Sequence, residues 1–312
     1  MEMLCIVGPT ATGKTRLSVA LAQRLGAEIV SCDSMQLYRG MDVGTAKPTA
    51  QEMGGVRHHM IDCLDPREEF SVSRYVELAD HCVQDILARG KPVIVVGGTG
   101  LYVDSLVAGR EFAPFPQTGR REALTARAEK EGIEPLMQEL RAVDPEAAES
   151  IHPSNQKRVI RALEVYLETG KTITQHNRET RSHPPKYRPV WIGLDYVNRS
   201  ALYARIDARV DEMFAQGLVD EVRRLLEGGV PERATSMQAI GYKELTAFLR
   251  GEGTEDAARE QIKLASRRYA KRQRTWFRRN PEVHWIDMPD TPDFGAVLEE
   301  ATQWTNGTKD EA

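Results

Sequence analysis

The sequence has few cysteines and no long apolar run, and both absences narrow the class of protein. Four cysteines occur in 312 residues (Cys5, Cys32, Cys63 and Cys82), without a CxxC pair or metal-ligand spacing. This pattern is typical of a cytoplasmic protein with reduced thiols, and it disfavours a disulfide-bonded domain. No segment approaches the ~18 apolar residues of a membrane span. The first residues lead directly into a strand, so we expect no signal peptide.

The sequence also lacks a strong charge of either sign. Its 42 Lys and Arg residues and 46 Asp and Glu residues give a formal net charge of −4. The balance argues against a protein that is basic over its whole surface, but it leaves room for local basic patches. Hydrophobic residues make up 41% of the chain, enough for one large domain or for a core with a smaller one.

The first hundred residues alternate between apolar runs and helical patterns. Residues 3–7 and 27–33 are apolar runs, and a third lies in KPVIVV, while 73–89 repeats apolar residues at helical spacing. This alternation predicts an α/β fold, with a parallel sheet and helices on both faces. Ligands in such sheets bind at the carboxyl ends of the strands. The loops expected at that edge are 8–15, 33–40 and 97–102.

A mostly helical pattern interrupts the α/β pattern after a proline-rich connector. We predict a helical insertion domain at residues 113–185, and a core domain formed by 1–112 and 186–305. Within the insertion, Asp144 and Pro145 have the types expected at a helix start. The last residues, 306–312, are polar and are expected to be disordered.

The stretch GPTATGKT matches the pattern GxxxxGK[ST] of a phosphate-binding P-loop. In such a loop, backbone N–H groups converge on phosphate oxygens, and the next helix points its positive end at them. Lys14 would neutralise phosphate charge and Thr15 would bind Mg²⁺. A strand before the loop and a helix after it favour this reading over a chance turn, so we expect a P-loop-containing core. The candidate diphosphate-binding residues are Gly8, Pro9, Thr10, Ala11, Thr12, Gly13, Lys14 and Thr15.

The ligand of this loop stays open at this point. Enzymes that hydrolyse nucleotides usually place an acidic residue at the end of a neighbouring strand. The run PVIVV ends instead in GGTG, so Asp33 is the acidic residue at such a position. Three roles compete for Asp33: a group behind a magnesium ion, a base that removes a proton from a nucleophile, or the cap of a turn.

Motifs along the chain resemble those of the tRNA dimethylallyltransferases. They are GPTATGKT, DSMQLYRGMDVGTAKP, HHMID, GGTGLY, RVIRALEVY, QAIGYKE and RRYAKRQRTWFRR, spanning residue 4 to about residue 280. The resemblance implies transfer of a dimethylallyl group from dimethylallyl diphosphate to an adenosine amine next to the anticodon of tRNA. It also implies Mg²⁺ as cofactor and the tRNA anticodon stem-loop as partner. The lack of a long apolar run predicts no membrane association. We expect a monomer. A free-adenylate prenyltransferase, or a P-loop kinase that binds ATP, remains an alternative.

The resemblance also suggests roles for individual residues. It makes Asp33 the base, with Thr10 and Lys14 beside it. Arg209 is the favoured arginine for the diphosphate and Arg205 is its alternative, although both also fit a solvated helix face. Gln36 is suited to hydrogen-bond an adenine edge.

Basic residues on the predicted helix 254–279 form a candidate RNA surface. Arg267, Lys271, Arg274 and Arg278 share one face, which is either a track for phosphates or a solvated face. Ile262, Tyr269 and Trp276 form a separate stripe that we expect to face the core. The candidate tRNA contacts are Asp33, Ser34, Met35, Gln36, Thr99, Lys157, Arg158, Val159, Ile160, Arg161, Arg274 and Arg278.

Overall fold

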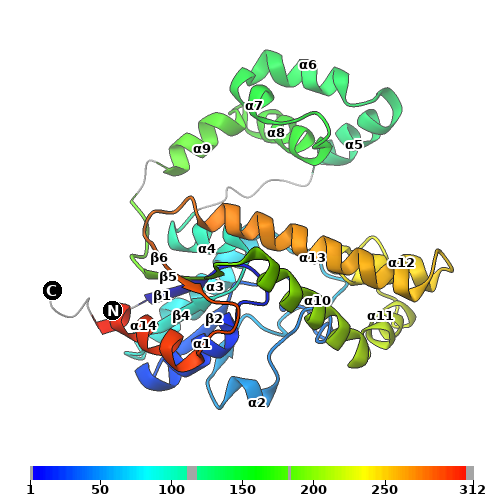
Figure 1. Cartoon of the computed structure of the whole chain (residues 1–312). Helices are drawn as coiled ribbons and strands as arrows, with labels where there is room; N and C mark the ends of the chain where they lie inside the picture. The colour runs from blue at the N-terminus through cyan, green and yellow to red at the C-terminus, as the bar shows by residue number, and fades with distance from the viewer. Residues whose placement is uncertain (1–2, 111–117, 182–183, 307–312) are drawn as a thin grey trace. The chain divides into compact units, whose positions relative to one another are not determined.

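A six-stranded parallel sheet forms the centre of the larger part of the molecule (Figure 1). Its strand order is β3-β2-β4-β1-β5-β6, and every neighbouring pair is parallel. The central strands are rich in Val and Ile because helices cover both faces of the sheet. The strands are β1 (Met3–Val7), β2 (Glu28–Ser31), β3 (His58–His59), β4 (Val93–Val96), β5 (Val190–Tyr196) and β6 (Val283–Met288).

The structure is a computed structural model that describes residues 3–110, 118–181 and 184–306. The chain divides into two units, Met1–Gly109 with Lys186–Ala312, and Arg110–Pro185. The boundary expected between residues 112 and 113 lies outside the described residues, and so does the expected tail, apart from Asn306. Those limits stay predictions.

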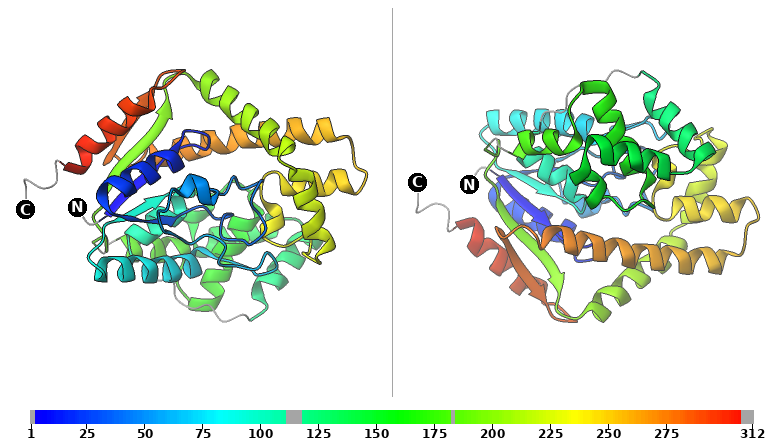
Figure 2. Two further views of the ribbon diagram at one scale, coloured as in Figure 1. Left: turned by 90° about the horizontal axis from the view of Figure 1, so that it is seen from below. Right: turned by 90° about the horizontal axis from the view of Figure 1, so that it is seen from above.

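Helices cover both faces of the sheet, as the alternating pattern predicted. The helices α1 and α14 lie on one face, and α3 and α4 lie on the other (Figure 2). The first turn of α1 follows the phosphate loop directly, so the positive end of this helix points at that loop. These helices are α1 (Lys14–Leu25), α3 (Val72–Ala88), α4 (Gly100–Val107) and α14 (Phe294–Asn306), and a short helix α2 (Ala50–Met53) precedes β3.

A group of helices after β5 completes the larger unit. The longest, α13, packs against α10, α12 and α4 (Figure 1). The hydroxyl of Thr254 caps α13 by accepting the Ala257 N–H at 3.2 Å, so the predicted start of this helix is confirmed. The group contains α10 (Arg199–Ala215), α11 (Leu218–Glu227), η1 (Ser236–Gln238), α12 (Tyr242–Leu249) and α13 (Glu255–Phe277).

The smaller unit is all helical and has its own hydrophobic core. Leu124, Leu136, Leu140 and Leu163 are among its buried residues. The Asp144 carboxylate caps α7 by accepting the Ala147 N–H at 3.1 Å, as its sequence predicted. The helices are α5 (Arg120–Glu131), α6 (Glu134–Val143), α7 (Pro145–Ser150), α8 (Gln156–Thr169) and α9 (Ile173–Arg181).

Candidate active site

The phosphate loop connects β1 to α1, in the strand–loop–helix order that the sequence predicted. At Gly8 the backbone has a φ of 135°, and a Cβ atom there would lie 2.3 Å from the Leu194 carbonyl oxygen. Only glycine therefore allows the loop to leave the sheet at this point. The half-buried Lys14 donates a hydrogen bond from Nζ to the Pro9 carbonyl at 2.5 Å, so its ammonium group lies across the loop.

The surroundings of Lys14 lower the pKa of its ammonium group. Burial lowers its pKa to about 8, and the neighbouring positive charge of Arg209 adds to this shift. A bound anion would relieve both effects. The electrostatics of the loop therefore favour a negatively charged ligand.

Two arginines of α10 reach the same loop. The Arg209 guanidinium donates to the Thr10 hydroxyl at 3.4 Å, and Arg205 Nε donates to the Ala11 carbonyl at 3.3 Å. Burial lowers the pKa of Arg209. Sequence had offered these residues as alternatives, or as parts of a solvated face. The structure brings both to the phosphate loop.

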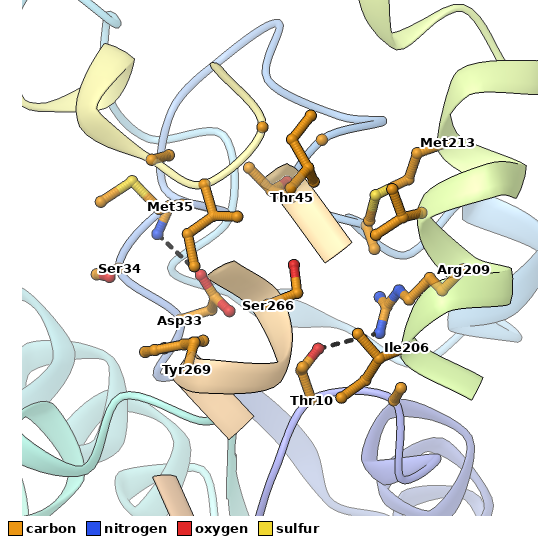
Figure 3. A pocket seen from close by; sticks show the side chains of 18 of the residues that line it. Thr10, Asp33, Ser34, Met35, Thr45, Ile206, Arg209, Met213, Ser266 and Tyr269 are labelled. Carbon is orange, nitrogen blue, oxygen red and sulfur yellow. Dashed lines mark hydrogen bonds between the residues drawn. The ribbon is translucent and has the colours of Figure 1, made fainter. Parts of the chain in front are cut away.

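Asp33 lies just beyond the carboxyl end of β2 and faces a cavity (Figure 3). Its Oδ1 accepts the Met35 N–H at 2.8 Å and the Gln36 N–H at 3.4 Å. The turn-cap role that sequence had considered is therefore present. Among the described residues, no group donates a hydrogen bond to Oδ2, and Asp33 forms no ion pair. One oxygen holds the turn, and the other stays available to a ligand.

The glycine-rich turn after β4 contacts the turn that carries Asp33. The Ser34 N–H donates to the Thr99 hydroxyl at 3.2 Å, so Thr99 helps to hold the turn in place. Gln36 also forms hydrogen bonds within this region. Its amide accepts from Ser31 Oγ at 3.2 Å and donates to the carbonyls of Thr45 and Ala46 at 3.3 Å. In this conformation the Gln36 amide holds the loop, and its predicted contact with adenine stays a prediction.

The cavity has a volume of about 330 Å³ and a lining of mixed polarity (Figure 3). Asp33, Ser34 and Met35 lie on one side, and Thr10 and Arg209 lie opposite them beside the apolar side chains of Ile206 and Met213. A wider cleft of about 840 Å³ next to it includes the phosphate loop. The arrangement suits a ligand with an anionic end and a short apolar group, placed beside a carboxylate.

Ile262 was predicted to face the core, and it is 2% exposed, so that prediction is confirmed, whereas Tyr269 is only half-buried. Both line the cavity, so the stripe on α13 forms part of the wall of the site. Burial and the charge of Asp33 raise the pKa of Tyr269 to about 12, so its hydroxyl is neutral at physiological pH. Trp276 follows the same stripe and donates from Nε1 to Asp104 at 2.8 Å.

Glu221 is a buried residue of the site that sequence reasoning missed. It is 2% exposed, and its carboxylate accepts the backbone N–H groups of Asp42, Val43 and Gly44 at 2.8–3.0 Å. The Tyr242 hydroxyl donates to the same carboxylate at 2.6 Å. Glu221 thus fixes the loop that contributes Gly44 to the cavity wall. A carboxylate within an amphipathic helix gives no local signal for such a role.

The chain matches a known protein family. Residues 36–280 match the family model described as IPP transferase, which covers well over half of the chain. The chain belongs to the IPP transferase family. The resemblance inferred from the motifs is therefore confirmed.

Individual members of this family match nearly the whole chain. The tRNA dimethylallyltransferase of Caldanaerobacter subterraneus is 47% identical over 309 residues, which is 98% of each chain. The crystal structure of the tRNA isopentenylpyrophosphate transferase from Bacillus halodurans is 44% identical, with a TM-score of 0.74 over 98% of this chain and 96% of that one. A eukaryotic dimethylallyltransferase, described in crystallographic snapshots acting on tRNA, is 29% identical. Its TM-score is 0.81, with 98% of this chain and 78% of that one covered.

The arginines predicted on α13 are largely engaged within the larger unit. Arg274 Nε contacts the buried Asp195 carboxylate at 2.6 Å, and Arg278 contacts the same carboxylate at 3.3 Å. Arg267 pairs with Asp207 at 2.7 Å. These residues therefore brace the fold, and their predicted contact with tRNA stays a prediction.

The predicted RNA-contact residues of α8 include both buried and exposed side chains. Val159 is 0% exposed and Ile160 is 7% exposed, and both belong to the hydrophobic core of the smaller unit. Helix periodicity turns both side chains inward, and the predicted contact of these two residues with tRNA stays a prediction. Lys157 and Arg158 are exposed, and within the described part of the chain neither forms an ion pair. Arg161 pairs with Glu164 at 2.8 Å.

The histidine pair of β3 serves the fold. His58 Nδ1 lies 2.9 Å from the Val56 carbonyl oxygen, and His59 Nε2 lies 2.8 Å from Glu28. Over residues 3–110, 118–181 and 184–306, no group of three or more His, Cys, Asp and Glu side chains is arranged to hold a metal ion. In the same ranges, no helix is long and apolar enough to cross a membrane.

Proposed function

We propose that the chain transfers a dimethylallyl group from dimethylallyl diphosphate to N6 of the adenosine immediately 3′ of the anticodon in tRNA. The observation that carries this proposal is the shared cavity. It combines the phosphate loop, apolar side chains and the carboxylate of Asp33, which forms no ion pair among the described residues and interacts with the charges of Lys14 and Arg209 only at longer range. The tRNA dimethylallyltransferases that match nearly the whole chain support the reaction class.

The reaction requires removal of the N6 proton and neutralisation of the charge on the leaving diphosphate. The N6 lone pair forms a bond to C1 of the dimethylallyl group, while the bond from C1 to the diphosphate oxygen breaks. Diphosphate leaves with that electron pair, and the N6 proton passes to Asp33. The amine is a weak nucleophile because its lone pair is delocalised into the ring, so proton removal during attack lowers the barrier.

The charge on the leaving diphosphate is met by the phosphate loop and its cations. Loop N–H groups and the amino end of α1 face the anion, and Lys14 and Arg209 add positive charge. Thr10 holds Arg209 against the loop. The apolar side chains of Ile206 and Met213, which lie beside Arg209, would contact the five-carbon group.

The residues present fit a Mg²⁺ ion that arrives with the substrate. The Thr15 hydroxyl, diphosphate oxygens and water form the oxygen donor set that Mg²⁺ prefers, and no protein metal cage is needed. The ion would supply further neutralisation of the diphosphate.

The RNA partner would be held by exposed cations and by the turn around Asp33. Lys157 and Arg158 are free for phosphate contacts, and Ser34 and Met35 line the cavity beside Asp33. A target base has to leave its stack to reach that cavity. We keep the monomer and the cytoplasmic location as predictions.

Mass spectrometry of the RNA products tests the proposal. The protein is incubated with Mg²⁺ and dimethylallyl diphosphate, together with unmodified tRNA or with free AMP. We expect one dimethylallyl group on the adenosine next to the anticodon and far slower labelling of AMP. Equal labelling of AMP would favour the free-adenylate alternative. Transfer of phosphate from ATP, without prenyl transfer, would favour a kinase.

A further inference from the structure

Gln273 of α13 lies between the two glycine-rich loops of the site. Its Oε1 accepts the Thr10 N–H at 2.9 Å, and its Nε2 donates to the Gly98 carbonyl at 3.0 Å. Thr10 belongs to the phosphate loop, and Gly98 belongs to the turn after β4. These residues lie 263 and 175 positions from Gln273 in the sequence, so only the fold brings the three together.

The fit around this side chain is close. Gln273 is 5% exposed, and a Cβ atom on Gly98 would lie 2.0 Å from its Nε2. Residue 98 therefore has to be glycine while this amide is in place. The carboxamide also supplies an acceptor on one side and a donor on the other. Neither a carboxylate nor a thioether can satisfy both loops at once.

The contact continues from the second loop to the base. Thr99 follows Gly98, and its hydroxyl accepts the Ser34 N–H at 3.2 Å. Ser34 follows Asp33 directly. One series of contacts thus joins the loop that would hold the leaving diphosphate to the turn that carries the proposed base.

We propose that Gln273 is a positioning residue that sets the distance between the diphosphate loop and the Asp33 turn. This inference rests on the proposed function, because it assigns the two loops to the two reactants. Gln273 contacts both loops and neither reactant, and it acts through the geometry of the loops. In-line transfer requires the reacting atoms to be aligned at about 3–3.5 Å, and a displacement of 1 Å costs about 10²-fold in rate.

The proposal predicts a separation of rate from binding. Without the Gln273 amide, Lys14 and the amino end of α1 still hold the diphosphate, and the Thr10 N–H becomes free to bind it. Ground-state affinity is therefore kept. The alignment of the two reactants is lost, so kcat falls.

Gln273→Met tests this prediction because methionine has a similar length and no amide. The matched control is Gln261→Met, at an exposed position of the same helix. We expect kcat and the single-turnover rate of Gln273→Met to fall about 10–100-fold, with KM for dimethylallyl diphosphate within about threefold of wild type. Gln261→Met should match wild type. Wild-type kcat in folded Gln273→Met, or a rise in KM that accounts for the whole loss, would overturn the proposal.

Gln273→Glu supplies a second and independent readout. At high pH its carboxylate accepts from Thr10 and faces the Gly98 carbonyl without a donor. Burial beside a carbonyl raises the pKa of such a carboxyl group. Its protonated form restores both hydrogen bonds, so the ratio of variant to wild-type kcat should rise as pH is lowered. A ratio that is independent of pH would contradict the proposal, and this variant carries the test if Gln273→Met does not fold.

The two hypotheses fail in different ways. Absence of prenyl transfer by the wild-type protein would end the proposed function. Normal transfer by wild type, and by both folded Gln273 variants, would end only the inference about Gln273.

Discussion

Two aspartates lie near the carboxyl ends of parallel strands, and their surroundings differ sharply. Asp195, in β5, has a side chain that is 1% exposed and contacts both Arg274 and Arg278. Asp33, just after β2, is half-buried, and among the described residues its carboxylate accepts backbone N–H groups and contacts no guanidinium group. Similar positions in the sheet therefore hold a paired carboxylate and an unpaired one.

The difference separates charges that hold the fold from charges that can act on a ligand. The Asp195 carboxylate contacts two guanidinium groups and accepts the Tyr196 N–H, so neither of its oxygens is left for a ligand. The cations show the same division. Arg274 pairs with Asp195, whereas Lys14 donates to a neutral carbonyl and has its pKa lowered to about 8. Lys14, Arg209 and Asp33 all line the cleft that includes the phosphate loop.

The largest expected effect comes from changing the unpaired carboxylate. In Asp33→Asn the side-chain oxygen still accepts the Met35 N–H, so the turn is kept while the base is removed. We expect kcat to fall about 10²–10⁴-fold, with tRNA affinity and melting temperature near wild type. Steady-state kinetics and thermal melts check both parts. An unchanged kcat would remove Asp33 as the base.

The paired carboxylate should respond in the opposite way. Asp195→Asn leaves Arg274 without its anion, whereas Arg278 keeps its ion pair with Asp287, and we expect the free energy of unfolding to fall by about 1–3 kcal/mol. The value is moderate because both arginines are about one-third exposed and can be solvated. Activity per folded molecule should stay within about twofold of wild type. A loss of kcat at unchanged stability would contradict the distinction between the two aspartates.

Lys14 sharpens the comparison through pH. Its pKa in the free protein is lowered to about 8, so the charged form is lost as pH rises through that value. A bound diphosphate favours the charged form, so the pH dependence should appear in KM. We expect KM for dimethylallyl diphosphate to rise up to about tenfold between pH 7 and pH 9. In Lys14→Arg, where the charge persists, this rise should be absent. A wild-type KM that is constant to pH 9 would show that the charge of Lys14 does not govern binding.

The smallest effects concern the two basic clusters. Lys157→Ala with Arg158→Ala should reduce the salt dependence of tRNA binding by roughly 0.7–0.9 in slope for each lost phosphate contact. The melting temperature should not change, since both side chains are exposed and unpaired among the described residues. Arg274→Ala with Arg278→Ala should lower the melting temperature. An unchanged slope in the first pair would exclude α8 from phosphate binding.

The parts of the site that sequence could predict are those with a local signal. The phosphate loop, the position of Asp33 and the start of α13 follow from neighbouring residues. Gln273 and Glu221 could not be found this way, because the backbone groups that they bind are 175 or more residues distant in the sequence. Arg274 and Asp195 are also far apart in the sequence. The sequence alone therefore gave no sign that this basic residue of α13 forms an ion pair. Val159 has basic neighbours in the sequence, and these suggested an RNA-binding segment. The helix period nevertheless places the Val159 side chain in the core.

A structure of the protein with tRNA and an unreactive thio-analogue of dimethylallyl diphosphate tests the central claim most directly. The account predicts the analogue's diphosphate in the loop around Lys14 and a flipped adenine in the cavity. It also predicts an Asp33 carboxylate oxygen within hydrogen-bond distance of N6, about 2.6–3.2 Å. An Asp33 carboxylate turned away from N6, or a nucleoside triphosphate retained in the loop in preference to the analogue, would contradict it.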